Sequence, residues 1–228
     1  MPKEIFISES FPSPLYKAFT QEQHAYDFLE QGNLILQPLK YFRNIEDINR
    51  KDKDEGKGKA EIIMKRPVLQ IDKYTGQLLS SKPEPGPVYF VTSTPNPCYI
   101  ISFSGPQVDL NYLIEKYGQY VLRINEPNKL VKAICSNLSQ SDNMPNVMWL
   151  ECIQVRYDKG QLTDNLPEPG SQERARMSYG QKASNYSRDC EYRLVLKLPI
   201  PTLNIPKVIY IELHTKLDYV DILKKDTK

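Results

Sequence analysis

Residues 191–198, EYRLVLKL, alternate between apolar and polar or charged side chains. In a β-strand successive side chains point to opposite faces, so the tyrosine and the three leucines share one face. Glu191, Arg193, Val195 and Lys197 then share the other face. We expect a strand that packs its leucines into a core and presents its charged side chains on the opposite side.

The string ISFS at 101–104 repeats this pattern. Ile101 and Phe103 point one way, and Ser102 and Ser104 point the other way. Two such strands, side by side, can line a cleft with polar groups. An ordinary half-buried antiparallel strand with one solvated face alternates in the same manner, so this plainer interpretation stays open.

Outward from these two strings, the chain shows more strands than helices. Helices are predicted over 20–32, capped by Thr20, over 109–118, and over 125–138, capped by Asn125. The end of the chain, after 207–213, is predicted to be a charged helix or tail. Further strands are predicted over 14–19, 33–39, 89–93, 119–124, 147–157 and 207–213.

The strands and helices do not alternate strictly, so the sequence predicts an α+β fold. We expect a mixed, largely antiparallel sheet with short flanking helices. A length of 228 residues, with 40% hydrophobic and 25% charged residues, suits one domain spanning 1–228. Two surface loops are expected within it, a charged one at about 43–59 and a polar one at about 158–173.

Composition excludes several classes of function. No run of 18 apolar residues or secretory signal is present, so we expect no membrane span and a cytoplasmic location. A net charge of +2 gives no broad attraction for nucleic acid, although a local basic groove stays open. No feature indicates the oligomeric state.

Metal and standard nucleotide motifs are also lacking. The four cysteines are far apart, and only two histidines are present, so no metal site is expected. The glycine patterns of P-loops, classical dinucleotide folds and serine-hydrolase elbows are missing. The segment EIIMK at 61–65 matches the metal-binding core of a nuclease only weakly, because no upstream aspartate is placed to complete it. A metal-dependent nuclease therefore ranks third among the alternatives.

The charged stretch after Tyr41 and Phe42 suggests a binding role. If it is helical, Arg43, Asp47 and Arg50 lie along one face. A guanidinium binds phosphate bidentately, so Arg43 and Arg50 are candidate substrate-binding residues. A solvated loop is the alternative interpretation of the same charges.

The strings LYKAF (15–19), FRNIED (42–47), ISFS and EYRLV resemble an uncharacterised bacterial domain family. Its members show an LYKY-like opening, a central FS strand and a late E-[YW]-R-L strand. The family is related in pattern to AbiGi-like abortive phage-resistance proteins. The resemblance covers about 14–213, but FRNIED replaces the family's asparagine-aspartate-proline turn, and a tryptophan-tyrosine string after the FS strand is absent.

The order of these strings also resembles the layout of ADP-ribosyltransferases. In those enzymes a basic residue on the first strand, a serine on a central strand and a late glutamate converge on NAD. Lys17, Ser102 or Ser104, and Glu191 take these places here, with lysine where arginine or histidine is usual. The resemblance implies a split sheet and NAD as a substrate.

The resemblance makes Glu191 the candidate catalytic residue. Breaking the bond between nicotinamide and ribose develops oxocarbenium charge, which a nearby carboxylate stabilises. Tyr16, Lys17 and Arg193 join the two serines as candidate substrate-binding residues. The plainer interpretation of Glu191 is an exposed strand residue paired with a neighbouring lysine.

These observations favour a phage-defence or toxin-type effector that acts on NAD or on another nucleotide-containing substrate. The partners implied are a nucleotide or macromolecular substrate and a cognate antitoxin or effector protein. A non-catalytic module that binds a nucleotide or protein, such as an antitoxin or phage-conflict partner, is the second hypothesis.

Overall fold

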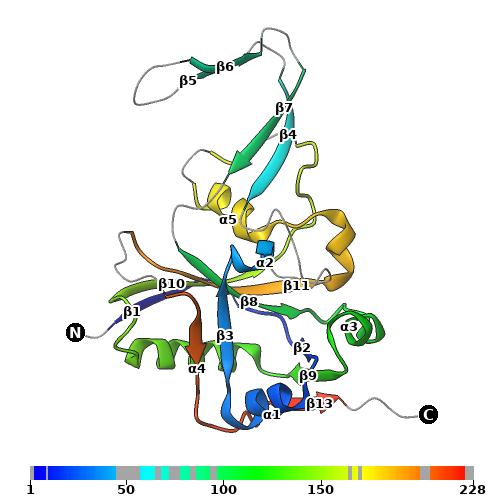
Figure 1. The fold of residues 1–228 in the computed structure, drawn as a ribbon, viewed down its shortest axis with the longest axis vertical. Coiled ribbons are helices and arrows are strands. Elements are labelled where there is room, and N and C mark those ends of the chain that lie inside the picture. The colour runs from blue at the N-terminus through cyan, green and yellow to red at the C-terminus, as the bar shows by residue number, and fades with distance from the viewer. Residues whose placement is uncertain are drawn as a thin grey trace.

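The computed structural model describes residues 3–8, 10–44, 57–64, 68–71, 78–82, 86–92, 97–163, 166–168, 171–200 and 206–223. A nine-stranded sheet forms the centre of this structure (Figure 1). Only β1 and β10 pair in parallel, and the other pairs are antiparallel. With few, short helices around it, this sheet confirms the predicted α+β fold class.

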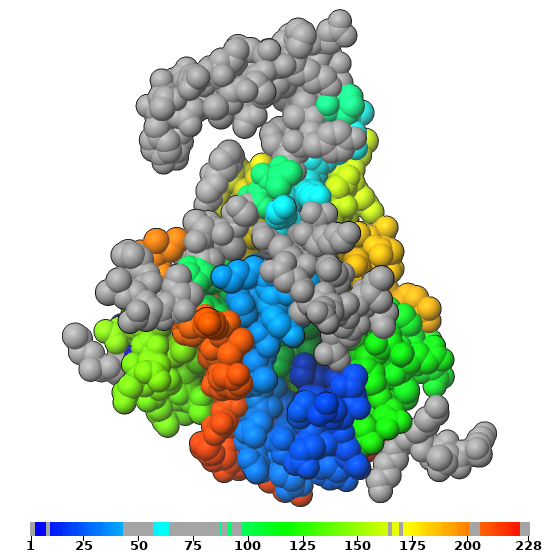
Figure 2. All heavy atoms as spheres, viewed as in Figure 1, coloured from blue at the N-terminus to red at the C-terminus, as the bar shows by residue number. Residues whose placement is uncertain are grey.

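The main path through the sheet is β1-β10-β11-β8-β2-β9-β13, and β3 joins β8 to β12. Figure 2 shows β12 and β3 together on one surface of the molecule. The strands of this sheet are β1 (Glu4–Ser8), β2 (Leu15–Phe19), β3 (Leu34–Pro38), β8 (Cys98–Ser104), β9 (Tyr120–Ile124), β10 (Val147–Gln154), β11 (Glu191–Lys197), β12 (Ile209–Ile211) and β13 (Val220–Leu223).

The sheet divides along one edge of β8. Strand β2 pairs with β8 at Tyr16 and Ser104. Strand β3 pairs with the other end of β8, where Gln37 lies opposite Ile100. Residues 101–103 lie between these two pairings, while their opposite edge pairs with β11 throughout. The division places the polar side chain of Ser102 at a gap between neighbouring strands.

The main core lies on the face of the sheet that carries the leucines of β11. Leu194 and Leu196 are fully buried there beside Phe103. Helix α1 (Glu22–Gln31) adds Ala25, Phe28 and Leu29, and α4 (Pro127–Gln140) adds a second apolar stripe. Each leucine or phenylalanine side chain contributes about 1.5–3 kcal/mol when fully buried, so this face anchors β8 and β11 firmly.

The opposite face is also covered. Val195 and Ile100 pack there against Tyr179, which belongs to α5 (Gln172–Gly180). The alternation predicted for 191–198 therefore assigns side chains to the correct faces, but the charged face is buried as well. A strand covered on both sides has to satisfy its charged groups inside the protein.

The starts of two helices differ from the sequence prediction by one residue. Helix α1 begins after Gln21, not after Thr20, and its C-cap is Gly32, as predicted, whose φ of 65° suits glycine. Helix α4 begins after Glu126, not after Asn125, because Pro127 at its first position fixes the start. Helix α3 (Leu110–Tyr117) is capped by Asp109, whose side chain accepts two backbone N–H groups.

The chain end after β12 was predicted as a charged helix or tail, and this prediction is wrong for 220–223. These residues form β13, which pairs with β9 and places Val220 opposite Ile124. Strand β1 was also missed. It is an edge strand whose Phe6 is 53% exposed, so it has no buried stripe that a pattern search detects.

The remaining elements lie outside the main sheet. Strand β4 (Gly58–Met64) pairs with β7 (Gly86–Thr92), and β5 (Val68–Ile71) pairs with β6 (Leu78–Lys82). The charged segment predicted at 43–59 begins in α2 (Tyr41–Asn44) and ends in β4. Residues 45–56 of this segment lie outside the described residues. Of the polar segment predicted at 158–173, the end belongs to α5. No described helix is long and apolar enough to cross a membrane.

Candidate functional site

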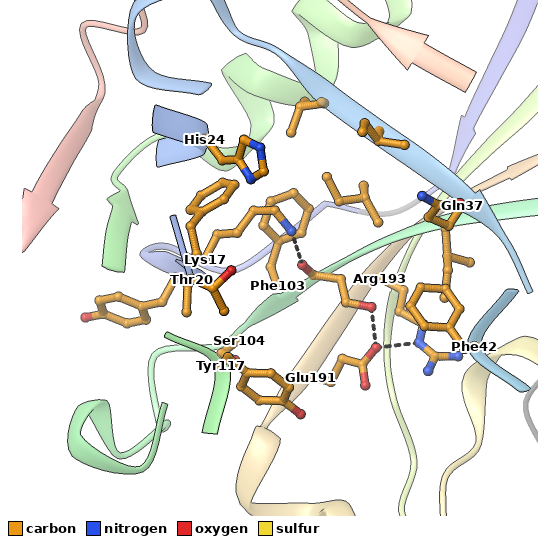
Figure 3. Close-up of a pocket in the computed structure, with 18 of the residues that line it drawn as sticks. Lys17, Thr20, His24, Gln37, Phe42, Phe103, Ser104, Tyr117, Glu191 and Arg193 are labelled. Atoms are coloured by element: carbon orange, nitrogen blue, oxygen red, sulfur yellow. Dashed lines mark hydrogen bonds and ion pairs between the residues drawn. The ribbon is translucent and has the colours of Figure 1, made fainter. Parts of the chain in front are cut away.

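A cavity of about 510 Å³ lies where β2 and β3 part along β8 (Figure 3). Six of the eight site residues predicted from the sequence line it, although they come from three different strands. These residues are Tyr16, Lys17, Ser102, Ser104, Glu191 and Arg193.

The two other predicted residues belong to the segment after β3. Arg43 lies in α2, but its side chain is outside the described residues, and all of Arg50 is outside them. Their aromatic neighbours Tyr41 and Phe42 do line the cavity. The two rings contact each other edge to face at 5.3 Å between centroids.

Glu191 is held at the cavity by three side chains. Its Oε1 accepts from the Ser102 hydroxyl at 2.5 Å and from Arg193 Nε at 2.7 Å. Its Oε2 lies 2.6 Å from Lys182 Nζ. Glu191 is only 4% exposed, so the plainer interpretation of an exposed strand residue is wrong, although the lysine partner is present.

These contacts fix the charge on Glu191. Burial by itself raises the pKa of a carboxyl, but the charges and hydrogen bonds of Arg193 and Lys182 outweigh it and hold the pKa of Glu191 far below its usual range. Glu191 is therefore ionised throughout the neutral range. It acts as a fixed negative charge and a hydrogen-bond acceptor, and it does not hold a proton to donate.

Arg193 is 1% exposed and lies two residues after Glu191 on the same face of β11. Its Nη1 donates to the carbonyl of Tyr179 at 2.7 Å. The guanidinium is thus held from two sides, by the Glu191 carboxylate and by the end of α5. Arg193 serves to position Glu191, and its face of β11 also lines the cavity.

A second carboxylate extends the network. Asp189 ends η1 (Ser184–Asp189), is 2% exposed, and lines the cavity. It accepts from the hydroxyls of Tyr112 at 2.7 Å and Tyr117 at 2.8 Å, and from Lys116 Nζ at 2.8 Å. Lys182 Nζ lies 3.9 Å from Asp189, so it links the two buried carboxylates.

Lys17 occupies the gap in the sheet. Its Nζ donates to the backbone carbonyl of Ser102 at 3.1 Å, as Figure 3 shows. The ammonium also lies over the rings of Phe103 and Phe19, at 5.3 and 5.7 Å from their centroids. Lys17 thus supplies a hydrogen bond to β8 where neither β2 nor β3 pairs with it, and it brings a positive charge to the cavity.

The two serines of β8 have different surroundings. Ser102 donates to Glu191 and lies at the gap, whereas Ser104 is 7% exposed and lies where β2 pairs with β8. The structure thus joins Ser102, and not Ser104, to the carboxylate. Of the two alternatives that the sequence left open, Ser102 is the residue that contacts Glu191.

Sequence reasoning missed several residues of the cavity wall. Lys182 and Asp189 come from the polar stretch before β11, whose path depends on tertiary packing and carries no periodic signal. Gln37 and Asn33 were treated only as part of a strand. Their side-chain oxygens are buried and have no hydrogen-bond partner among the described residues.

The described residues contain no group of three or more histidine, cysteine or acidic side chains placed to hold a metal ion. The cavity lining combines three cations (Lys17, Lys182 and Arg193) with four carboxylates (Asp27, Asp189, Glu191 and Glu212). The basic side chains and the aromatic walls suit a polar ligand that carries planar rings. Comparison with protein-family models, with curated proteins and with solved structures finds no match to this chain.

Proposed function

We propose that the cavity binds NAD or a closely related dinucleotide and breaks its nicotinamide–ribose bond, as ADP-ribosyltransferases do. One observation supports this function best. Lys17, Ser102 and Glu191, on the neighbouring strands β2, β8 and β11, meet at one cavity where the sheet divides. The cavity of about 510 Å³ lies within the usual range for small-molecule sites.

The proposed chemistry uses the fixed charge of Glu191. When the bond between ribose C1′ and the ring nitrogen breaks, its electron pair goes to nicotinamide and positive charge develops on the ribose. The Glu191 carboxylate stabilises that charge and accepts a hydrogen bond from a ribose hydroxyl. Water or an acceptor group then attacks C1′ and loses one proton, giving nicotinamide and an ADP-ribosyl product.

The resemblance to phage-resistance proteins supplies the biological setting of this proposal. A protein that consumes NAD or modifies a macromolecule harms its own cell, so expression is expected to be toxic unless a cognate antitoxin is present. This setting places the protein in the cytoplasm of a bacterium. The macromolecular acceptor is the partner that such a reaction requires.

The test is a nicotinamide-release assay with Glu191→Gln and Glu151→Gln. Glu151 is equally buried and charged but does not line the cavity, so it is the matched control. We expect Glu191→Gln to lose at least about 100-fold in rate, because the charge on the oxocarbenium is no longer balanced. Full activity in Glu191→Gln, or no release by the wild-type protein with NAD or an acceptor, contradicts the proposal.

One observation favours the second candidate, a non-catalytic nucleotide-binding module. Arg193 and Lys182 already neutralise Glu191, which weakens its ability to stabilise a developing cation. A binding module predicts that NAD raises the melting temperature and is not consumed. A ligand at 100 times its dissociation constant stabilises a protein by about 2.7 kcal/mol, which is readily measured as a thermal shift.

A further inference from the structure

Two exposed side chains line one side of the cavity. Tyr210 on β12 is 67% exposed, Ile35 on β3 is 44% exposed, and both belong to the cavity lining. They lie opposite each other in the antiparallel β3–β12 pair, so their Cβ atoms are about 5 Å apart and their side chains share a face. Adjacent exposed apolar groups beside a cavity are typical of a binding surface. We call these two residues the Tyr210 shelf.

The Tyr210 shelf rests on well-packed strands, which Figure 2 shows side by side on the surface. The chain neighbours of both shelf residues are buried in the main core. These neighbours are Leu34, Leu36, Ile209 and Ile211. Side chains alternate along a strand, so the buried neighbours hold Tyr210 and Ile35 on the side away from that core. A ring presented by a rigid strand loses little conformational freedom when a ligand binds.

The Tyr210 shelf and Glu191 lie on different strands around the same cavity. Strand β11, which carries Glu191, pairs with β8, β8 pairs with β3, and β3 pairs with β12. Neighbouring strands lie about 4.8 Å apart, so three strand spacings, about 15 Å along the sheet, separate β11 from β12. The cavity can therefore hold two distant groups of one elongated ligand. A dinucleotide has this shape, because two riboses and a pyrophosphate separate its two bases.

We propose that the Tyr210 shelf binds the adenine ring of the dinucleotide by stacking, while Glu191 faces the ribose that carries nicotinamide. This inference rests on the proposed function and deepens it, because it assigns the second base of the ligand to the β3–β12 side of the cavity. Every base has a π face, so stacking on tyrosine does not select among bases. The shelf therefore favours dinucleotides over mononucleotides.

The experiment compares NAD with nicotinamide mononucleotide, which lacks the adenosine half. Dissociation constants are measured by isothermal titration with short incubations. We expect Tyr210→Ala to weaken NAD binding by about tenfold, within the usual range for one stacked base, and to leave binding of the mononucleotide unchanged. Tyr210→Phe keeps the ring and is expected to bind both ligands as the wild-type protein does.

The control is Tyr26→Ala, which makes the same substitution on α1, where Tyr26 is 42% exposed and lies outside the cavity lining. It is expected to change neither dissociation constant. Unchanged NAD binding in Tyr210→Ala overturns the role of the Tyr210 shelf and leaves the proposed function standing. Equal weakening of both ligands, or weaker NAD binding in Tyr210→Phe, also overturns that role. No binding of NAD by the wild-type protein overturns the proposed function itself, and the shelf with it.

Discussion

Two buried carboxylates, Glu151 and Glu191, lie on the same face of the neighbouring strands β10 and β11 but differ in their relation to the cavity. Glu151 is 1% exposed and accepts from Arg176 at 2.6 Å, Lys197 at 3.0 Å and the Tyr179 hydroxyl at 2.7 Å. Glu191 is likewise held by an arginine, a lysine and a hydroxyl. Only Glu191 lines the cavity.

The comparison of Glu151 with Glu191 shows that burial and ion pairing alone do not identify a functional carboxylate. Both carboxyls have a lowered pKa, because hydrogen bonds and cationic partners, led by the Tyr179 hydroxyl at Glu151 and by Arg193 at Glu191, outweigh the opposing effect of burial. Perturbed pKa values are common at functional sites, but structural ion pairs produce them too. Glu191 lines the cavity next to the division in the sheet, whereas Glu151 does not. This access to the cavity distinguishes the candidate functional site at Glu191 from the structural ion-pair cluster at Glu151.

The first way to sharpen the comparison is to remove the arginine of each cluster. Arg193 is 1% exposed, and its loss leaves Glu191 with less charge compensation and the Tyr179 carbonyl without its donor. We expect Arg193→Met to lower the free energy of unfolding by about 3–5 kcal/mol. Arg176 has a side chain 32% exposed, so Arg176→Met is expected to cost only about 1 kcal/mol.

Urea denaturation measures both losses under the same conditions. Equal losses for the two variants would show that the difference in burial between Arg193 and Arg176 does not determine how much each arginine stabilises the protein. A loss near zero for Arg193→Met would show that the cavity admits enough water to solvate Glu191, and the site would then be open rather than preorganised.

Much of the fold follows from the sequence because its central strands carry strong periodic patterns. In EYRLVLKL and ISFS the alternation is clear apart from Val195, so the faces of their side chains are assigned correctly. Strands β1 and β13 lie at the two ends of the main path through the sheet, and their few residues carry little buried area. Their positions are determined by pairing with distant strands, which a local pattern does not encode.

The site is predicted only in part for the same reason. Lys17, Ser102 and Glu191 lie on strands whose motifs are recognisable, so their convergence was expected. Lys182 reaches Glu191 from an irregular segment between α5 and β11. Gln37 is distinguished by an unpartnered oxygen, and a missing hydrogen bond has no signature in the sequence.

A second way to sharpen the comparison is to lower the pH. A carboxyl whose pKa is lower in the folded state stabilises the fold above its unfolded pKa, which is about 4.3 for glutamate, and this stabilisation is lost as pH falls toward the folded pKa. We therefore expect the free energy of unfolding to fall below about pH 4.3. Glu191→Gln and Glu151→Gln should each remove part of that fall.

Urea denaturation of the three proteins between neutral and acid pH measures the slopes. The larger change in slope is expected for Glu191→Gln, because Glu191 has the more strongly lowered pKa. If the free energy of unfolding of Glu191→Gln depends on pH as that of the wild-type protein does, Arg193 and Lys182 do not hold the Glu191 carboxylate in solution as they do in the structure.

The smallest expected effect separates the two serines of β8. Ser102→Ala removes a hydroxyl that donates to the ionised Glu191, and hydrogen bonds to charged groups contribute about 1.5–3 kcal/mol. We expect a loss near the lower limit, about 1.5 kcal/mol, because Arg193 and Lys182 still hold the carboxylate. Ser104→Ala, at the position opposite Glu191 in the β8–β11 pair, is expected to cost less, about 0.5 kcal/mol, because Ser102 is the serine that donates to the carboxylate.

A double-mutant cycle tests whether the Ser102 effect passes through the carboxylate. In a Glu191→Gln background the charge is gone, so Ser102→Ala should cost clearly less than it does in the wild-type protein. The difference is the coupling free energy between the two side chains, measured by urea denaturation of the four proteins. A cost that is identical in both backgrounds would show that Ser102 stabilises β8 by packing alone, and the Ser102 contact would then not belong to the Glu191 site.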